Sequence, residues 1–159
     1  MSPADRSQFS SLIKSGNEAY GNGEFESALR FYSAAHQIKS DHAILNSNIA
    51  ATCYELNQFE EAEIFAKRAI DLNPNYNRAH ITLGMLYLLN EDFTAGWSEY
   101  EWVATLVKKF KSLPEQRKWQ GEELKGKRIV VIDEQGYGDT IQFIRFSKML
   151  VNAGADVFL

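Results

Sequence analysis

Apolar side chains recur with helical spacing through most of the chain. Near the middle of this region, Ile49, Cys53 and Leu56 form one apolar stripe, and a second stripe of mainly small residues follows Phe59. Spacings of three and four residues place such side chains on one face of an α-helix. Pro74 closes the second stripe, because proline cannot continue the helical hydrogen-bond ladder. The pattern predicts helices over residues 7–21, 25–38, 43–56, 60–71, 77–89 and 93–110.

Residue types also return at a fixed interval of 34 positions. Small residues at helix crossings and aromatic residues at helix starts keep this register. The two sets are Gly16, Ala50 and Gly84, and Phe25, Phe59 and Phe93. This period, with two antiparallel helices in each unit, resembles the tetratricopeptide repeat. The resemblance implies a mainly α fold, in which three helix-turn-helix repeats form a right-handed α-solenoid over residues 7–110. The repeats fall at about 9–42, 43–76 and 77–110.

The first helix of each pair lines the concave face of a tetratricopeptide stack, so polar residues on these helices are candidate contacts for a partner. They are Lys14, Asn17, Tyr20, Asn48, Glu55, Arg78 and Thr82, with Ala51 and Met85 between them. An asparagine amide can both donate to and accept from a peptide backbone. We therefore expect this face to bind a peptide or protein partner. The simpler alternative is that these residues are only solvated.

A more specific alternative is a carboxylate clamp. Some chaperone-binding tetratricopeptide domains hold the C-terminal carboxylate of a peptide with Lys, Asn, Asn, Lys and Arg. Asn17, Asn48 and Arg78 fall at three of these places, with arginine in place of lysine. Ile13 and Thr82 occupy the other two places and do not match. The sequence therefore favours a generic peptide groove over a true clamp.

The repeat gives way to a glycine- and charge-rich segment, residues 111–127, which we expect to be a linker. A β-branched run from Arg128 then predicts a buried strand. A glycine turn follows, and apolar residues recur at helical spacing up to about Asn152. A second strand is predicted from Asp156. Strand, turn, helix and strand together predict a short Rossmann-like βαβ unit over residues 128–159.

Several motifs late in the chain carry a second resemblance. They are Gly96–Trp102, Trp119–Gly121, Leu124–Lys127 and, most specifically, Glu134–Phe146. With these motifs the chain resembles bacterial tetratricopeptide proteins that carry a glycosyltransferase-like domain, similar to the heptosyltransferases. The resemblance implies that residues 128–159 begin a two-domain GT-B glycosyltransferase, which uses a nucleotide-sugar donor. It also implies that Asp139 is the base that deprotonates the acceptor hydroxyl. The alternative is that Asp139 only caps the following helix.

The chain ends at Leu159, inside the second predicted strand. In such enzymes the second domain holds most of the donor, so we expect no cofactor and no activity in this chain by itself. We predict a protein-interaction module fused to an incomplete glycosyltransferase-like domain. The alternative is the N-terminal, acceptor-recognising part of an active enzyme. Because a two-stranded unit leaves strand edges unpaired, we expect residues 128–159 to form a homodimer contact or to pack on the last repeat helix.

Composition narrows the remaining classes. The 159 residues are 45% apolar and 24% charged, as in globular proteins. No apolar run approaches the roughly 20 residues of a membrane span. The N-terminus has no secretory signal, and the single cysteine, Cys53, excludes an internal disulfide and a cysteine-based zinc site. We therefore expect a cytoplasmic protein without a metal site or a membrane span.

Charge is distributed unevenly along the chain. Residues 1–104 carry 7 basic and 14 acidic residues, whereas residues 105–128 carry 8 basic and 3 acidic ones. The basic stretch could contact nucleic acid. Its flanks are acidic, however, and its composition is that of a domain boundary. We favour a solvated linker and expect no nucleic-acid partner.

Overall fold

The computed structural model describes residues 2–106, 119, 121–132 and 136–159, apart from the side chain of Asp139. The chain divides into two compact units, Met1–Leu106 and Val107–Leu159. The end of the sixth predicted helix, residues 107–110, and most of the predicted linker lie outside the described residues.

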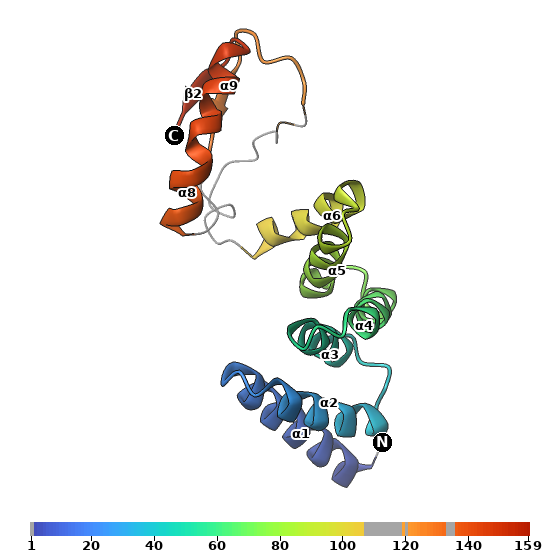
Figure 1. Cartoon of the computed structure of the whole chain (residues 1–159). Helices are drawn as coiled ribbons and strands as arrows, with labels where there is room; N and C mark the ends of the chain where they lie inside the picture. Colours follow the sequence, from blue (N-terminus) through green and yellow to red (C-terminus); the bar gives the residue numbers. More distant parts are fainter. Residues whose placement is uncertain (1, 107–118, 120, 133–135) are drawn as a thin grey trace. The chain divides into compact units, whose positions relative to one another are not determined.

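The first unit is a stack of helical hairpins. Its helices are α1 (Pro3–Gly21), α2 (Phe25–Ile38), α3 (Ala43–Glu55), α4 (Phe59–Leu72), α5 (Asn77–Leu89) and α6 (Phe93–Tyr100), followed by the 3-10 turn η1 (Glu101–Thr105). Helices pack in the pairs α1–α2, α3–α4 and α5–α6, and α2–α3 and α4–α5 contacts join one pair to the next (Figure 1). This arrangement is a mainly helical solenoid.

The 34-residue register predicted most helix ends to within one residue, but α1 begins earlier than expected. Ser2 is its N-cap, and the Ser2 hydroxyl accepts from the backbone N–H of Asp5 at 3.1 Å. The Asp5 carboxylate in turn accepts from the backbone N–H of Ser2 at 3.0 Å. This reciprocal capping box, with Pro3 in the first helical turn, extends α1 to the start of the chain.

The sixth predicted helix is wrong in its second half, because α6 ends at Tyr100 and the chain tightens into η1. Within η1 the Trp102 ring stacks on His80 of α5, with centroids 4.2 Å apart and planes 9° from parallel. The Thr105 hydroxyl accepts from the Asn77 amide at 2.9 Å. These contacts with α5 hold the 3-10 turn in place, and the hydrophobic period alone does not encode them.

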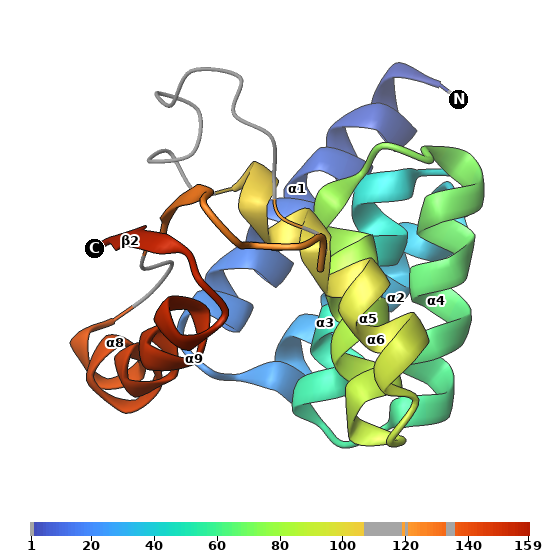
Figure 2. The same ribbon diagram turned by 90° about the horizontal axis from the view of Figure 1, so that it is seen from above.

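Small residues form the helix crossings, as the repeat pattern predicts. The alanines at the crossings are fully buried: Ala28, Ala35, Ala62, Ala66 and Ala69. Figure 2, a view from above, shows how closely the helices of this unit run beside one another. A Cβ added at Gly84 would lie 2.7 Å from the backbone nitrogen of Tyr100. One at Gly16 would overlap the ring of Tyr32. Glycine at these two positions is therefore a packing requirement.

The second unit contains β1 (Arg128–Val130), α8 (Tyr137–Phe143), the 3-10 turn η2 (Ile144–Phe146), α9 (Ser147–Asn152) and β2 (Asp156–Phe158). The two strands form a parallel sheet in which Ile129 pairs with Val157. The single predicted helix is thus split by η2, and it begins before Thr140. After α9, Gly154 adopts φ 89°, the left-handed conformation that commonly ends a helix.

Candidate functional site

Helices α1, α3 and α5 carry the partner-binding residues predicted from the sequence, and the structure brings several of them together. The Asn48 amide of α3 donates to Oδ1 of Asn17 on α1 at 3.1 Å. The Tyr32 hydroxyl of α2 donates to the same oxygen at 2.7 Å. We call Asn17, Tyr32 and Asn48 the amide cluster. It links two neighbouring repeats through side chains alone.

Tyr32 is the member that sequence reasoning missed. Its ring is 2% exposed and lies over Gly16, so the absence of a side chain at Gly16 makes room for it. Burial raises the pKa of Tyr32 to about 12; nearby Tyr20 adds to this rise, and a hydrogen bond with Asn48 opposes it. The phenol therefore stays a neutral donor and fixes the orientation of the Asn17 amide. Gly16 was the sequence signal for this contact, but the repeat pattern indicated only a small residue at a helix crossing.

The hydrogen bonds of the cluster decide what it presents to a ligand. A carbonyl oxygen has two lone pairs, and Oδ1 of Asn17 accepts from both Tyr32 and Asn48. Asn17 therefore offers its amide N–H groups, and Asn48 offers its carbonyl oxygen. A donor and an acceptor stand side by side on the α1–α3–α5 face.

Tyr20, Glu55 and Arg78 form a charged group on the same face. The Tyr20 hydroxyl donates to Oε1 of Glu55 at 3.4 Å, between α1 and α3. Burial raises the pKa of Tyr20, the Glu55 carboxylate adds to that rise, and the positive charge of Arg78 on α5 opposes it. The charge of Arg78 thus acts on Tyr20, and Arg78 is exposed. All three repeats contribute to this face.

Other predicted contacts do not join this group. The Nζ atom of Lys14 lies 3.9 Å from Oε1 of Glu18 on the same helix, and both side chains are exposed. Thr82 is buried, and its hydroxyl donates to the backbone oxygen of Arg78 at 3.1 Å. Ile13 packs against the hydrophobic core. The two positions that depart from the carboxylate-clamp pattern therefore add no cation to the face.

His80 positions the third repeat, a role that its sequence context did not reveal. One ring nitrogen contacts the Glu99 carboxylate of α6, and the other lies 2.8 Å from the backbone oxygen of Pro74. Trp102 stacks on the ring. His80 thereby ties α5, which carries Arg78, to α6 and to the turn before α5.

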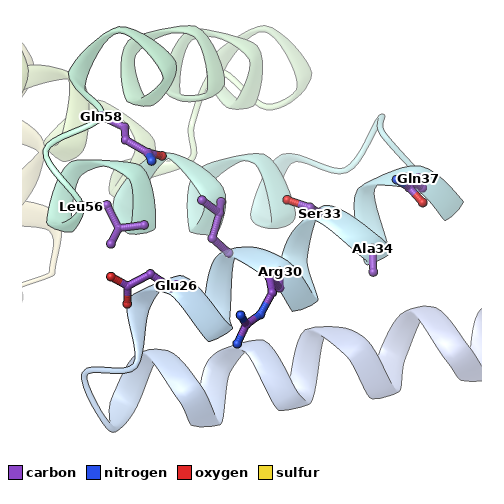
Figure 3. A pocket seen from close by; sticks show the side chains of 8 residues that line it. Glu26, Arg30, Ser33, Ala34, Gln37, Leu56 and Gln58 are labelled. Carbon is purple, nitrogen blue, oxygen red and sulfur yellow. The ribbon is translucent and has the colours of Figure 1, made fainter.

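A separate cavity of about 620 Å³ lies between α2 and the α3–α4 turn. Figure 3 shows Glu26 and Arg30 of α2 and Leu56 and Gln58 near the turn among its lining side chains. The cavity is open, its two charges are opposite in sign, and none of the predicted partner-binding residues lines it. We take the α1–α3–α5 face as the candidate site.

The remaining candidates add little chemistry. Burial raises the pKa of the Cys53 thiol to about 11, so it stays protonated as a core residue.

The backbone of Asp139 lies in α8, but its side chain is outside the described residues. So are most of the basic residues of the stretch 105–128. Across the described part of the chain, His, Cys, Asp and Glu form no group suited to a metal ion. No helix there is long and apolar enough to cross a membrane.

Comparisons with known proteins bear on the helical unit. Residues 19–86 match the family model described as tetratricopeptide repeat. This match identifies residues 19–86 as tetratricopeptide repeats. Among curated relatives, the inactive TPR repeat-containing thioredoxin TTL3 of Arabidopsis thaliana is 38% identical over 77 residues, which are 48% of this chain and 11% of the relative. RNA polymerase II-associated protein 3 of Xenopus tropicalis is 30% identical over 104 residues, 65% of this chain and 16% of the relative. The chain thus spans a small part of the length of either relative.

Solved structures share the fold of the tetratricopeptide domain. The Arabidopsis OM64 TPR domain superposes with a TM-score of 0.61 at 20% identity, covering 66% of this chain and 87% of that one. The second TPR of Spaghetti (RPAP3), bound to the HSP90 peptide SRMEEVD, gives 0.58 at 24% identity, covering 65% and 97%. The domain therefore shares the fold of tetratricopeptide domains, one of which was solved with an HSP90 peptide.

Proposed function

We propose that the α1–α3–α5 face binds an extended peptide segment of a partner protein. The observation that carries this proposal is the amide cluster, in which Asn17 and Asn48 of different repeats are held 3.1 Å apart. Each peptide unit carries one C=O acceptor and one N–H donor. The cluster offers a donor from Asn17 beside an acceptor from Asn48, which is the complementary pair.

The charged group sets a preference for side chains of the peptide. Arg78 is exposed and would pair with an acidic side chain, since its guanidinium presents several donors to a carboxylate. Glu55 would accept from a donor of the peptide in place of the long 3.4 Å bond from Tyr20. The HSP90 peptide SRMEEVD in the Spaghetti structure is rich in acidic residues, which makes it a suitable first probe.

The peptide need not end in the groove. Ile13 packs against the core and Thr82 bonds to its own helix, so a terminal carboxylate would find one arginine where a clamp supplies several cations. The donor–acceptor pair at Asn17 and Asn48 suits an internal peptide unit better than a carboxylate, which only accepts. We therefore favour an internal segment over a C-terminal carboxylate.

A peptide array tests the groove. The whole chain and its Asn48→Ala and Asn75→Ala variants are applied to an array of 12-residue peptides that includes SRMEEVD. Asn75 is an exposed asparagine in the turn before α5, so its variant is the matched control. We expect bound peptides to lose at least tenfold in affinity with Asn48→Ala and to be unaffected by Asn75→Ala. Binding that is indifferent to Asn48 would reject the α1–α3–α5 face.

The same peptides distinguish an internal segment from a terminus. Each bound peptide is measured again with an amidated C-terminus, which removes the terminal charge. An internal segment predicts a change of less than about threefold, whereas a carboxylate clamp predicts a loss of tenfold or more, as expected for a charged hydrogen-bond partner.

A second candidate is acceptor recognition for a glycosyltransferase. The observation that favours it is the parallel β1–β2 pair joined by helices, which is how a Rossmann-like domain begins. On this proposal Asp139 acts as the acceptor base, a nucleotide sugar is the donor, and the repeats select the acceptor. Asp139 is the third residue of α8, where a helix N-terminus also favours a carboxylate without any catalytic role.

Calorimetry separates these roles. Heat on titrating the chain with UDP-, GDP- or ADP-linked sugars, together with a lower transfer rate for Asp139→Asn, supports the enzyme. Absence of heat with every donor argues against it and leaves peptide binding as the function of the chain.

A further inference from the structure

The two ends of the tetratricopeptide stack differ in what they expose. Within the described residues, α1 at the first end exposes no large apolar side chain. At the other end, Phe93 and Trp97 of α6 are each 58% exposed. A repeat stack needs polar outer faces at its ends to stay soluble. The α6 end therefore exposes an apolar surface of the kind that contacts another element, whereas the surface of the α1 end is polar.

The repeat register shows what kind of surface this is. Trp97 is equivalent to Leu29 of the first repeat, two intervals of 34 residues earlier. Leu29 is half-buried and packs against the core, and it lines the same cavity as Leu56, which ends α3 of the following hairpin. In the first repeat, this position therefore lies on the side of α2 that faces the next hairpin. At Trp97 the same position has no following repeat among the described residues, and the surface has the geometry of a site for one more helix.

Phe93 lacks the tyrosine neighbour that contacts the equivalent phenylalanine in each of the first two repeats. Phe25 makes an edge-to-face contact with Tyr20, with ring centroids 5.3 Å apart, and Phe59 makes the same contact with Tyr54 at a centroid distance of 5.9 Å. In the third repeat the tyrosine is replaced by Leu88. Phe93 and Trp97 are four residues apart on α6, so both side chains lie on one face of the helix.

Charge indicates which helix would fit. Residues 79–106 contain four acidic residues and no lysine or arginine. Glu91 and Asp92 precede the exposed Phe93 directly, and both are exposed. A second copy of this chain would bring the same acidic ends together, which is unfavourable. The polar α1 face also offers a second copy no apolar partner surface.

We infer that the α6 face, made of Phe93 and Trp97 with Glu91 and Asp92 at its edge, binds a basic amphipathic helix of a partner protein. The apolar stripe of that helix covers Phe93 and Trp97, as a following repeat would. Its lysines and arginines lie near Glu91 and Asp92. This surface is distinct from the α1–α3–α5 face, so one chain could hold a peptide and a helix at the same time.

A model helix tests the inference on the whole chain. The probe is the fluorescein-labelled, amidated peptide KLLKKLLKKLLKKL, followed by anisotropy. We expect Trp97→Ser and Phe93→Ser each to weaken binding at least tenfold, because aromatic anchors dominate such contacts. Ile64→Ser is the matched control, since Ile64 of α4 is 65% exposed elsewhere on the domain. Glu91→Asn should weaken binding a few-fold and reduce its salt dependence; asparagine tolerates the φ of 63° at this position.

Two results would overturn the inference. One is equal affinity of the Trp97→Ser and Ile64→Ser variants, which would make the peptide contact nonspecific. The other is a doubled mass of the free chain in light scattering that Trp97→Ser abolishes, which would make a second copy the occupant. Asn48→Ala should leave helix binding unchanged, so the outcome is independent of the proposed peptide groove.

Discussion

The tetratricopeptide domain and the βαβ unit use apolar residues in opposite ways. In the domain, alanines such as Ala28, Ala62 and Ala66 are fully buried at the helix crossings. In the described part of the second unit, which contains the βαβ unit, Leu124 and Ala155 are the buried apolar residues, while Tyr137 is 90% and Ile141 75% exposed. Each repeat completes its core on its neighbour. A two-stranded sheet with helices attached has no second layer to complete its own.

The largest effect is expected when a methyl group is added at a helix crossing of the tetratricopeptide domain. In Gly84→Ala the new Cβ would meet the Tyr100 backbone at 2.7 Å, and backbone atoms cannot move aside as a flexible side chain can. We expect a loss of about 3 kcal/mol in the free energy of unfolding, the upper part of the range for overpacking. Urea titration followed by helical circular dichroism measures it.

The control is the same substitution in the open unit. Gly138 lies in α8, and a Cβ there would have no neighbour within 4 Å among the described atoms. Gly138→Ala should leave the main unfolding transition unchanged and favour α8 by about 1 kcal/mol through helix propensity. Equal losses in the two variants would contradict the contrast between a packed domain and an open unit.

A smaller loss of stability is expected when a hydrogen bond is removed and the packing of the ring is kept. Tyr32→Phe keeps the ring over Gly16 but removes the hydroxyl that donates to Asn17. We expect a loss of about 1 kcal/mol of stability and several-fold weaker peptide binding, because the Asn17 amide is no longer fixed. Tyr54→Phe, on a half-buried tyrosine of α3, is the control. An unchanged affinity in Tyr32→Phe would show that the amide cluster is structural only.

The exposed face of the βαβ unit gives a third prediction. We propose that residues 128–159 pair with a second copy, because the sheet has two strands among the described residues and Ile141 of α8 and Met149 of α9 are exposed. Light scattering should show up to twice the monomer mass at high concentration, and Ile141→Lys should restore the monomer. Backbone amides of β1 and β2 should exchange more slowly as concentration rises. A monomer at all concentrations with rapidly exchanging strand amides would reject the dimer.

The repeat period predicted the helical domain well because local sequence decides it. The bounds of α2 and α5 follow from apolar spacing and the 34-residue register, and they match the prediction to the residue. The early start of α1 was also readable, since Ser2, Pro3 and Asp5 form a capping signature. By contrast, η1 depends on the stacking of Trp102 on His80, a tertiary contact without a local signal.

For the candidate site, the sequence predicted which residues share a face but not how their side chains meet. Repeat register placed Asn17 and Asn48 on one face, and their side chains do meet. It could not foresee that Tyr32, from the other helix of the pair, would fix Asn17. It also grouped Thr82 with them, although that hydroxyl bonds to its own helix. Register fixes where a Cα lies, whereas rotamers and burial decide which side chains reach one another.

The smallest expected effect is acid sensitivity, which should be confined to the tetratricopeptide domain because all three histidines lie in it. His42 is the N-cap of α3, and its Nδ1 accepts from the Leu45 N–H at 3.2 Å. Burial lowers the pKa of His42, Lys39 lowers it further, and Asp41 opposes them. A protonated ring cannot accept at Nδ1. The contribution of this cap is therefore complete above the unfolded pKa of about 6.5. It declines as pH falls towards the lower folded pKa, because the unfolded chain binds the proton first.

Between pH 7.5 and 5.5 we expect the free energy of unfolding to fall by at most about 1 kcal/mol, the usual value of an N-cap. His42→Asn keeps a capping side chain that does not titrate, so its urea midpoint should change less between these pH values than that of the unsubstituted chain. An equal change in both proteins would assign the acid sensitivity to other groups.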